Sequence, residues 1–364
     1  MSARAAWGAL AVLAVTGTAA IPAGATGGRG LPVPPTAVRV DSLVRPGERH
    51  FAELWQLTFG GENAEAYWSA DGRRVIFQAT LGGWPCDQMY VMDLAGGKVA
   101  RASTGTGRTT CGYFYDRDRR ILYASTHLAA DSCPPLPDYS QGYVWPVYPG
   151  YDIFTARPDG SDLRRLTDTP GYDAEATVSV DGKWIVFTSV RDGDLDLYRM
   201  RPDGTGLVRL THEPGYDGGA FFSHDGAWIC YRAFHPADSA GLEQYRGLLG
   251  RALVRPTQMD LWVARADGSD KRQVTRDPGA SFAPYFTPDD KALIYSSNRH
   301  DPGGRDFDLY LVGVEGGAPE PVTRDPLFDG FPMFSPDGKW LLFGSNRGAK
   351  SRHETNVFLA RWRP

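Results

Sequence analysis

The stretch PGYDAEATVSVDGKWIVFTSVRDGDLDLYRMRPDGTGLVRLT, residues 170–211, contains one complete four-stranded unit. Short apolar or alternating segments, typical of β-strands, are separated by the tight-turn pairs Asp181-Gly182 and Asp203-Gly204. Four strands of this length cannot bury both faces of their sheet alone. The unit therefore predicts neighbouring copies of itself.

Five further copies of this unit occur along the chain. The first turn, Ser/Thr-x-Asp-Gly in its clearest form, recurs with its aspartate at positions 71, 181, 225, 289 and 337, and a degenerate copy centred on position 117 fills the gap. An apolar strand follows each of the six turns. Successive turns are 44–48 residues apart in three intervals and 64 residues apart in two. The two long intervals hold the insertions 127–150 and 235–258.

The ends of the chain complete the count. The fourth strand of a unit ends in Leu-Thr or Val-Thr, as at Thr211, and one extra QLT ends at Thr58, before the first full unit. The sixth unit lacks a fourth strand, so residues 50–58 are predicted to supply it. The prediction is an all-β, six-bladed β-propeller of four-stranded blades, closed by an N-terminal outer strand in the C-terminal blade.

The repeat S-x-DG-x-x-(I/V)-x-F-x-S-x-R … LY-x-M-x-x-DG-x-x-x-x-LT resembles the propeller repeats of the TolB family over about 310 residues, all six blades. The resemblance implies an extracytoplasmic bacterial propeller. TolB itself carries an α/β domain before its propeller, and residues 26–49 are too short for one. The chain therefore resembles a stand-alone, Tol biopolymer-transport-like relative, which is a statement about fold more than activity.

The N-terminal residues 1–25 have the pattern of a secretory signal peptide. Arg4 precedes an uncharged apolar run, and Ala23-Gly24-Ala25 fits a cleavage site. An N-terminal membrane anchor is the alternative. We expect residues 26–49 to form an extended leader and residues 50–364 the propeller, in a periplasmic or secreted protein without a membrane span in its mature chain.

A net charge of −4, without a basic cluster, argues against a nucleic-acid partner. Acidic residues instead recur where each blade begins. The positions eight residues before each first turn are Asn63, Thr109, Asp173, Asp217, Ser281 and Asp329, and those two residues further on are Glu65, Cys111, Glu175, Gly219, Ala283 and Phe331. The five acids favour either an electronegative mouth for a cation, an amine or a basic peptide, or carboxylates that cap their own turns.

Four arginines follow second strands in a repeated context: Arg191, Arg299, Arg347 and the similar Arg232. Their repetition favours a structural role, as bridges to acids of adjacent blades. A place in a ligand pocket is the alternative.

The two insertions join second to third strands and are predicted to lie on the same face as the acids, here called the top. Insertion one, 127–150, is rich in proline and carries Tyr143, Trp145 and Tyr148, which could form a binding wall or pack on neighbouring blades. Insertion two, 235–258, has leucines at helical spacing and predicts a short amphipathic helix on the rim.

Histidines and cysteines suggest two further features of the top face. A divalent metal could be held by loop histidines, yet no tight His-x-His pair occurs, so we expect no cofactor; the weak candidates are His127, His235, His300 and His353. One disulfide is expected in an oxidising compartment, from one pair among Cys86, Cys111 and Cys133, while Cys230 lies in an apolar strand.

Together these features predict a binding propeller without catalytic residues. It would recognise a protein or peptide of the cell envelope, or a small ligand, through Asp173, Asp217, Asp329, Glu65, Glu175 and the aromatic wall. The alternative is a propeller-type lyase or hydrolase that uses top-face histidines and acids with a divalent metal. A serine hydrolase is excluded because Gly279-Ala-Ser281-Phe-Ala283 lies in a repeat entry turn and not in a nucleophile elbow.

Overall fold

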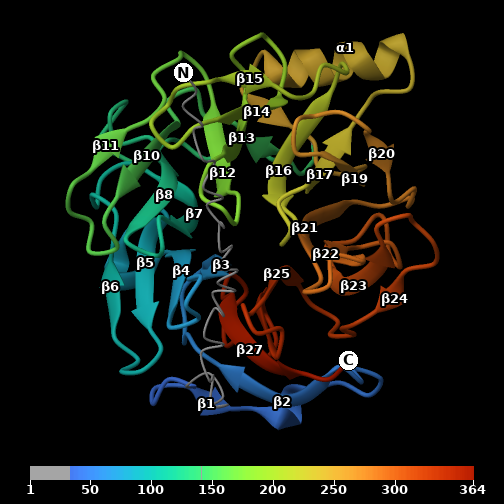
Figure 1. Cartoon of the computed structure of the whole chain (residues 1–364). Helices are drawn as coiled ribbons and strands as arrows, with labels where there is room; N and C mark the ends of the chain where they lie inside the picture. The colour runs from blue at the N-terminus through green and yellow to red at the C-terminus, as the bar shows by residue number, and fades with distance from the viewer. Residues whose placement is uncertain (1–32, 141) are drawn as a thin grey trace, which may run out of the picture. The chain divides into compact units, whose positions relative to one another are not determined.

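A computed structural model describes residues 33–140 and 142–364; the predicted signal peptide lies outside them. Six antiparallel sheets surround a central axis, each with its first strand innermost (Figure 1). The all-β, six-bladed propeller predicted from the repeat is confirmed. In this part of the chain no helix has the length and apolar character needed to cross a membrane.

Blades one to three follow one another directly along the chain. Blade one consists of β3 (Asn63–Trp68), β4 (Arg74–Ala79), β5 (Gln88–Asp93) and β6 (Val99–Arg101). Blade two consists of β7 (Thr109–Tyr115), β8 (Arg120–Ser125), β10 (Asp152–Ala156) and β11 (Arg164–Arg165). Blade three consists of β12 (Asp173–Val178), β13 (Ile185–Ser189), β14 (Asp196–Met200) and β15 (Val208–Arg209).

Blades four to six complete the ring. Blade four consists of β16 (Tyr216–Phe222), β17 (Trp228–Phe234), β19 (Asp260–Arg265) and β20 (Arg272–Gln273). Blade five consists of β21 (Ser281–Phe286), β22 (Ala292–Ser297), β23 (Asp308–Gly313) and β24 (Glu320–Pro321). Blade six consists of β25 (Asp329–Phe334), β26 (Trp340–Ser345), β27 (Asn356–Trp362) and the N-terminal β2 (Phe51–Gln56).

The recurring Ser-x-Asp-Gly turn has a physical explanation. In blade three, the Ser179 hydroxyl donates to Asp181 Oδ1 at 2.7 Å and accepts the Trp184 N–H at 3.0 Å, which closes the turn between β12 and β13. Gly182 takes a positive φ of 71°, which favours glycine. The buried strand that follows, with Phe187 fully enclosed, packs against the neighbouring blades.

Ring closure follows the predicted route and includes one more strand. β2 pairs antiparallel with β27, with Leu54 opposite Ala360. β1 (Val38–Arg39) adds to the outside of β2, and the short 3-10 helix η1 (Asp41–Leu43) follows it. The described part of the predicted leader is thus built into blade six instead of extending away from it.

The two insertions join each other above the ring. β9 (Trp145–Pro146) of insertion one pairs with β18 (Leu253–Val254) of insertion two. The predicted helix is present as α1 (Ser239–Leu249), and Tyr245 on it donates a 2.8 Å hydrogen bond to the Gly215 carbonyl. The joined insertions share a buried cluster with blade three, which includes Ala174 and Leu195.

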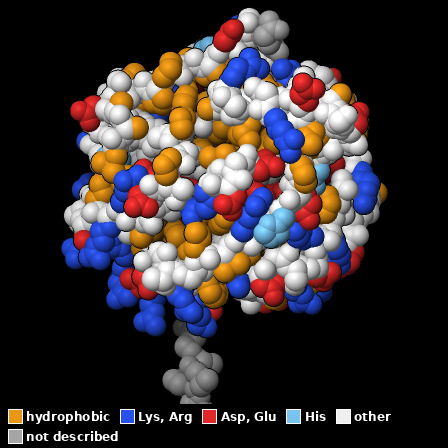
Figure 2. Space-filling model, turned by 90° about the horizontal axis from the view of Figure 1, so that it is seen from above, with side chains coloured by type: hydrophobic (Ala, Val, Ile, Leu, Met, Phe, Trp, Pro, Cys, Tyr) orange, Lys and Arg blue, Asp and Glu red, His pale blue; other side chains and the backbone are white. Residues whose placement is uncertain are grey.

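The face seen in Figure 2, turned by 90° from the view of Figure 1, carries charges of both signs. Acidic and basic side chains lie among hydrophobic ones over most of this face, and Lys and Arg side chains gather along its lower left edge. This distribution agrees with the small net charge of −4.

Candidate functional site

A cavity of about 1090 Å³ lies on the propeller axis. Side chains from all six blades and from both insertions line it. It is therefore the place where the top-face residues predicted from the sequence can meet one ligand.

A β-bulge in every inner strand brings one residue per blade to this cavity. The pairing register shifts once in each first strand, and the bulged residues have φ between 49° and 62°. They are the second set of predicted entry positions, and all six line the cavity: Glu65, Cys111, Glu175, Gly219, Ala283 and Phe331. We call these six residues the bulge ring.

Of the first set of entry positions, Asn63 lines the cavity, but the three aspartates do not. Asp173, Asp217 and Asp329 are buried, and each is bound by a side chain from the second-to-third-strand loop of its own blade. Arg191 donates to Asp173 at 3.0 Å, and Arg347 donates to Asp329 at 2.7 Å.

The third aspartate, Asp217, contacts His235 at 3.1 Å. These three carboxylates hold loops in place and do not form an electronegative mouth. Arg191 and Arg347 thus bridge within their own blades and not, as expected, between adjacent blades, whereas Arg232 makes the expected contact with an acid of the adjacent blade.

An aromatic layer closes the channel below the bulge ring. Two residues beyond the bulge, the side chains of Tyr67, Tyr113, Phe221 and Tyr285 meet. Tyr67 of blade one and Phe221 of blade four come from opposite sides of the ring, yet their centroids are 5.3 Å apart. The cavity is therefore blind at this level.

A buried ion pair joins blades three and four at the cavity wall. Arg232 on β17 donates to Glu175, and the same guanidinium donates to the Tyr216 hydroxyl at 2.6 Å. Thr188 donates to Glu175 at 2.7 Å, and the Gly219 N–H donates at 3.0 Å. Glu175 is thus fully engaged. A Cβ at Gly219 would overlap the Arg232 guanidinium, which explains the glycine in blade four.

Glu65 is the carboxylate of the bulge ring that has no such compensation. Arg232 pairs with Glu175, and Arg108 makes a looser contact with Asp87 at 3.9 Å; Glu65 takes part in neither ion pair. Burial raises the pKa of Glu65 to about 7, with Glu175 adding to the rise and a hydrogen bond with Cys111 opposing it. Burial, together with Glu65, also raises the pKa of the Cys111 thiol, which stays protonated.

The aromatic residues of insertion one form a roof over the cavity. Tyr143, Trp145 and Tyr148 all line it. The Trp145 indole N–H donates to the Tyr143 hydroxyl at 3.1 Å, and the Tyr148 hydroxyl donates to the Pro135 carbonyl at 2.7 Å. Trp145 also stacks on the Arg232 guanidinium at 5.1 Å. The predicted wall therefore contacts the predicted acid Glu175 through Arg232.

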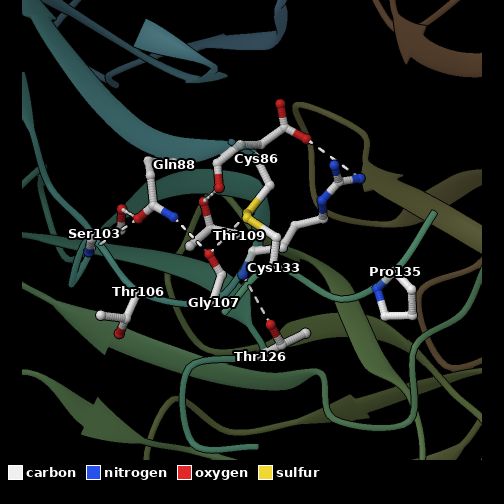
Figure 3. The surroundings of a disulfide bond; sticks show 12 residues. Cys86, Gln88, Ser103, Thr106, Gly107, Thr109, Thr126, Cys133 and Pro135 are labelled. Carbon is white, nitrogen blue, oxygen red and sulfur yellow. Dashed lines mark hydrogen bonds and ion pairs between the residues drawn. A yellow bond between two sulfur atoms is a disulfide. The ribbon is translucent and has the colours of Figure 1, made fainter. Parts of the chain in front are cut away.

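A disulfide fixes the start of this roof. Cys86, in the loop after β4, is bonded to Cys133 of insertion one, 47 residues along the chain (Figure 3). Gln88 lies beside it and donates to the Gly107 carbonyl at 2.8 Å. Cys111 remains a thiol in the cavity, and Cys230 is a buried thiol in β17.

The four candidate histidines do not converge. His127 contacts Ser125, His235 contacts Asp217 and His300 contacts Tyr310, each within its own blade; His353 alone lines the cavity. Across residues 33–140 and 142–364, no group of three or more His, Cys, Asp or Glu side chains is placed to hold a metal ion.

Two features of the cavity go beyond what the sequence predicted. Arg232 was predicted to bridge to an acid of an adjacent blade, with a ligand pocket as the alternative. It bonds Glu175 of blade three and lines the cavity, but it does so from within strand β17 and not from a loop. Its position inside the run TrpIleCysTyrArgAlaPhe was the available signal, because an arginine in a buried strand needs a partner. The second feature is a phenylalanine cluster from blades five and six, for which spacing gave no signal: Phe282, Phe307, Phe328 and Phe331.

Comparisons with known proteins agree with the fold. No protein-family model matches the chain, and no curated protein matches it. Among solved structures, TolB from Acinetobacter baumannii is similar at 15% identity and TM-score 0.52, over 73% of this chain and 58% of that one. A putative TolB from Agrobacterium tumefaciens is similar at 18% identity and TM-score 0.55, over 90% and 97%.

An oligogalacturonate lyase in complex with manganese is similar at 14% identity and TM-score 0.50, over 86% of this chain and 95% of that one. The chain spans little more than half of the A. baumannii protein but nearly all of the other two. At these identities the likeness concerns the fold. The chain has the TolB-like six-bladed β-propeller fold.

Proposed function

We propose that this protein is an extracytoplasmic binding propeller that holds a small ligand in its central cavity. The observation that carries the proposal is the blind cavity itself, closed below by the aromatic layer and roofed by two insertions that pair with each other. Its volume suits a small organic molecule. The predicted signal peptide supports a periplasmic or secreted location.

The residues proposed to contact the ligand come from three levels. Glu65 and Glu175 belong to the bulge ring, with Arg232 beside them. Tyr143, Trp145 and Tyr148 belong to the roof. A protein or peptide of the cell envelope, as the TolB-like neighbours suggest, would instead contact the exposed rim, because the roof covers the axis.

A thermal-shift and calorimetric screen of amines, organic acids, sugars and uronates tests the proposal. Trp145→Ala removes the roof side chain, and Val180→Ala, at a 70% exposed turn position outside the cavity, is the control. We expect at least one compound to stabilise wild type and Val180→Ala but not Trp145→Ala. The proposal fails if no compound binds while an envelope protein is captured equally well by wild type and Trp145→Ala.

An enzymatic role, as a lyase or hydrolase, is the second candidate. Its specific support is Glu65, because a carboxyl with a pKa of about 7 suits acid–base catalysis near neutral pH. One similar structure is an oligogalacturonate lyase in complex with manganese. Incubation with oligogalacturonate and Mn²⁺ should then yield an unsaturated product that Glu65→Gln does not form; equal background for both proteins removes this candidate.

A further inference from the structure

We propose that the cavity selects a small organic cation, an amine whose ammonium group lies against Glu65 and whose apolar part lies against the phenylalanine cluster. This inference rests on the proposed small-ligand function and names the chemistry of the ligand. It follows from how polar and apolar groups are divided around the axis.

The bulge ring has a polar half and an apolar half. Blades one to three contribute Glu65, Cys111 and Glu175, whereas blades five and six contribute Ala283 and Phe331. A ligand that fills such a cavity needs one polar end and one apolar side.

The apolar half is enlarged by neighbouring side chains. Phe331 packs with Phe282 and Phe328, and these two also contact Phe307. Centroid distances within the cluster are 5.1 to 6.3 Å, and all four rings line the cavity. Leu327 beside them is 46% exposed. The cluster offers an aromatic surface to the apolar part of a ligand.

Within the bulge ring, Glu65 is the carboxylate left for a cation. Glu175 is engaged by Arg232, Tyr216, Thr188 and a backbone N–H, so it has no capacity for a second cation. Glu65 has a hydrogen bond with the neutral Cys111 thiol. A carboxylate in a poorly solvated cavity gains from a charge-assisted hydrogen bond, and an ammonium group supplies it.

The floor of the cavity also favours a cation. Tyr67 and Phe221 of the aromatic layer line the cavity close to the bulge ring. Ring faces attract cations when water is excluded. The wall already uses this interaction, because the Arg232 guanidinium lies 5.1 Å from the Trp145 ring and 5.4 Å from the Tyr216 ring.

The mouth of the cavity carries exposed arginines, beside the exposed Glu62, and these arginines define the competing ligand. Arg305 and Arg352 line the cavity and are exposed; Arg305 lies over the Tyr143 ring at 4.2 Å. An anion would bind at these arginines and not at the bulge ring. We favour the cation because the mouth arginines are exposed, whereas Glu65 is half-buried inside the cavity, and less hydrated groups give the larger discrimination.

Three probes of the same size and hydrocarbon part separate these outcomes. Calorimetry with phenethylamine, 2-phenylethanol and phenylacetate presents the cavity with a cation, a neutral molecule and an anion. For wild type we expect phenethylamine to bind at least tenfold more tightly than 2-phenylethanol, the size of one charge-assisted hydrogen bond. Phenylacetate should bind more weakly than both.

Two variants locate the effect. Glu65→Gln keeps the shape of the side chain and should remove the preference for phenethylamine. Val180→Ala, at an exposed turn position outside the cavity, should retain it. Equal binding of phenethylamine by wild type and Glu65→Gln would overturn the assignment to Glu65.

The wild-type comparison does not depend on how the variants fold. Phenylacetate as the tightest probe, or no binding of phenethylamine, overturns the inference. If the broader screen then finds a ligand that is not an amine, the small-ligand function stands and only its chemistry is wrong. If that screen finds no ligand at all, the proposed function fails as well.

Discussion

At the scale of single residues, Glu65 shows how a local backbone irregularity creates a site. Its φ of 50° is the left-handed conformation of a β-bulge residue, and the bulge turns its side chain toward the axis. In a regular strand, residues two apart share a face. The bulge breaks this rule, so Asp173 is enclosed within its blade while Glu175 lines the cavity.

This bulge also explains what could be predicted at residue scale. Counting from the Asp-Gly turn located both sets of entry positions correctly. It could not distinguish them, because the bulge is not marked by any residue type: Glu, Cys, Gly, Ala and Phe all occupy it. The deciding contacts, such as Arg191 with Asp173, join residues whose partners the sequence does not specify.

Glu65→Gln should change the pH dependence of stability. The carboxyl titrates near 4.5 when unfolded and near 7 when folded, so between these values the folded chain holds a proton that the unfolded chain releases. Wild-type stability therefore falls as pH rises from 4.5 to 7. Glu65→Gln does not lose stability in this way. At pH 8 its free energy of unfolding should therefore exceed that of wild type, by at most about 3 kcal/mol.

Urea denaturation of both proteins at pH 5, 6, 7 and 8 measures the difference. The charged and titratable groups facing Glu65 are Cys111, Glu175, Arg232 and Asp87, and all remain in the variant. The gap in unfolding free energy should widen with pH. A constant gap would show that Glu65 titrates with an ordinary pKa.

Arg232→Met should be strongly destabilising, because it leaves Glu175 buried and without its cation. Breaking a buried pair in this way costs about 3–5 kcal/mol. The double variant Arg232→Met with Glu175→Gln removes the orphaned charge and should recover part of the loss. Denaturation of the single and double variants measures this coupling; strictly additive losses would contradict the buried pair.

At the scale of elements, the roof is the part that distinguishes this propeller from a plain repeat. The two long intervals between turns predicted the insertions that form the roof, and the spacing of leucines predicted α1. The pairing of β9 with β18 was not predicted, because each strand has only two residues and carries no periodic signal. Tertiary packing over blade three determines that contact.

The disulfide should stabilise the roof more than the blades. Cys86→Ser with Cys133→Ser removes a cross-link that spans 47 residues, with an expected loss of about 2–4 kcal/mol. Hydrogen exchange should rise mainly within 127–150, and in the inner strands much less. Reduced wild type should match the variant, whereas a uniform rise over all blades would show that the bond supports the whole ring.

At the scale of the whole molecule, the fold was predictable because the repeats can be counted directly in the sequence. Six turns, six apolar second strands and one displaced QLT left a closed ring as the consistent arrangement. Counting the repeats could not reveal that Glu48 also helps to close the ring. This buried carboxylate contacts Arg347 at 3.1 Å, and Arg347 also bonds Asp329, so the segment before β2 is locked to blade six.

Removal of the closing strand should open the ring. A chain that begins at Phe59 lacks β2 and exposes the edge of β27, which invites pairing between molecules. We expect it to aggregate or form oligomers in size-exclusion chromatography. A chain that begins at Thr26, the predicted mature start, serves as the reference.

An intermediate truncation separates the strand from the ion pair. A chain that begins at Arg49 keeps β2 but lacks Glu48, so Arg347 loses one of its two carboxylates in a buried site. It should remain monomeric and lose about 3–5 kcal/mol of unfolding free energy. Adding a peptide of residues 33–58 to the chain from Phe59 should restore a monomeric complex; a monomeric, stable chain from Phe59 alone would show that the ring does not need this strand.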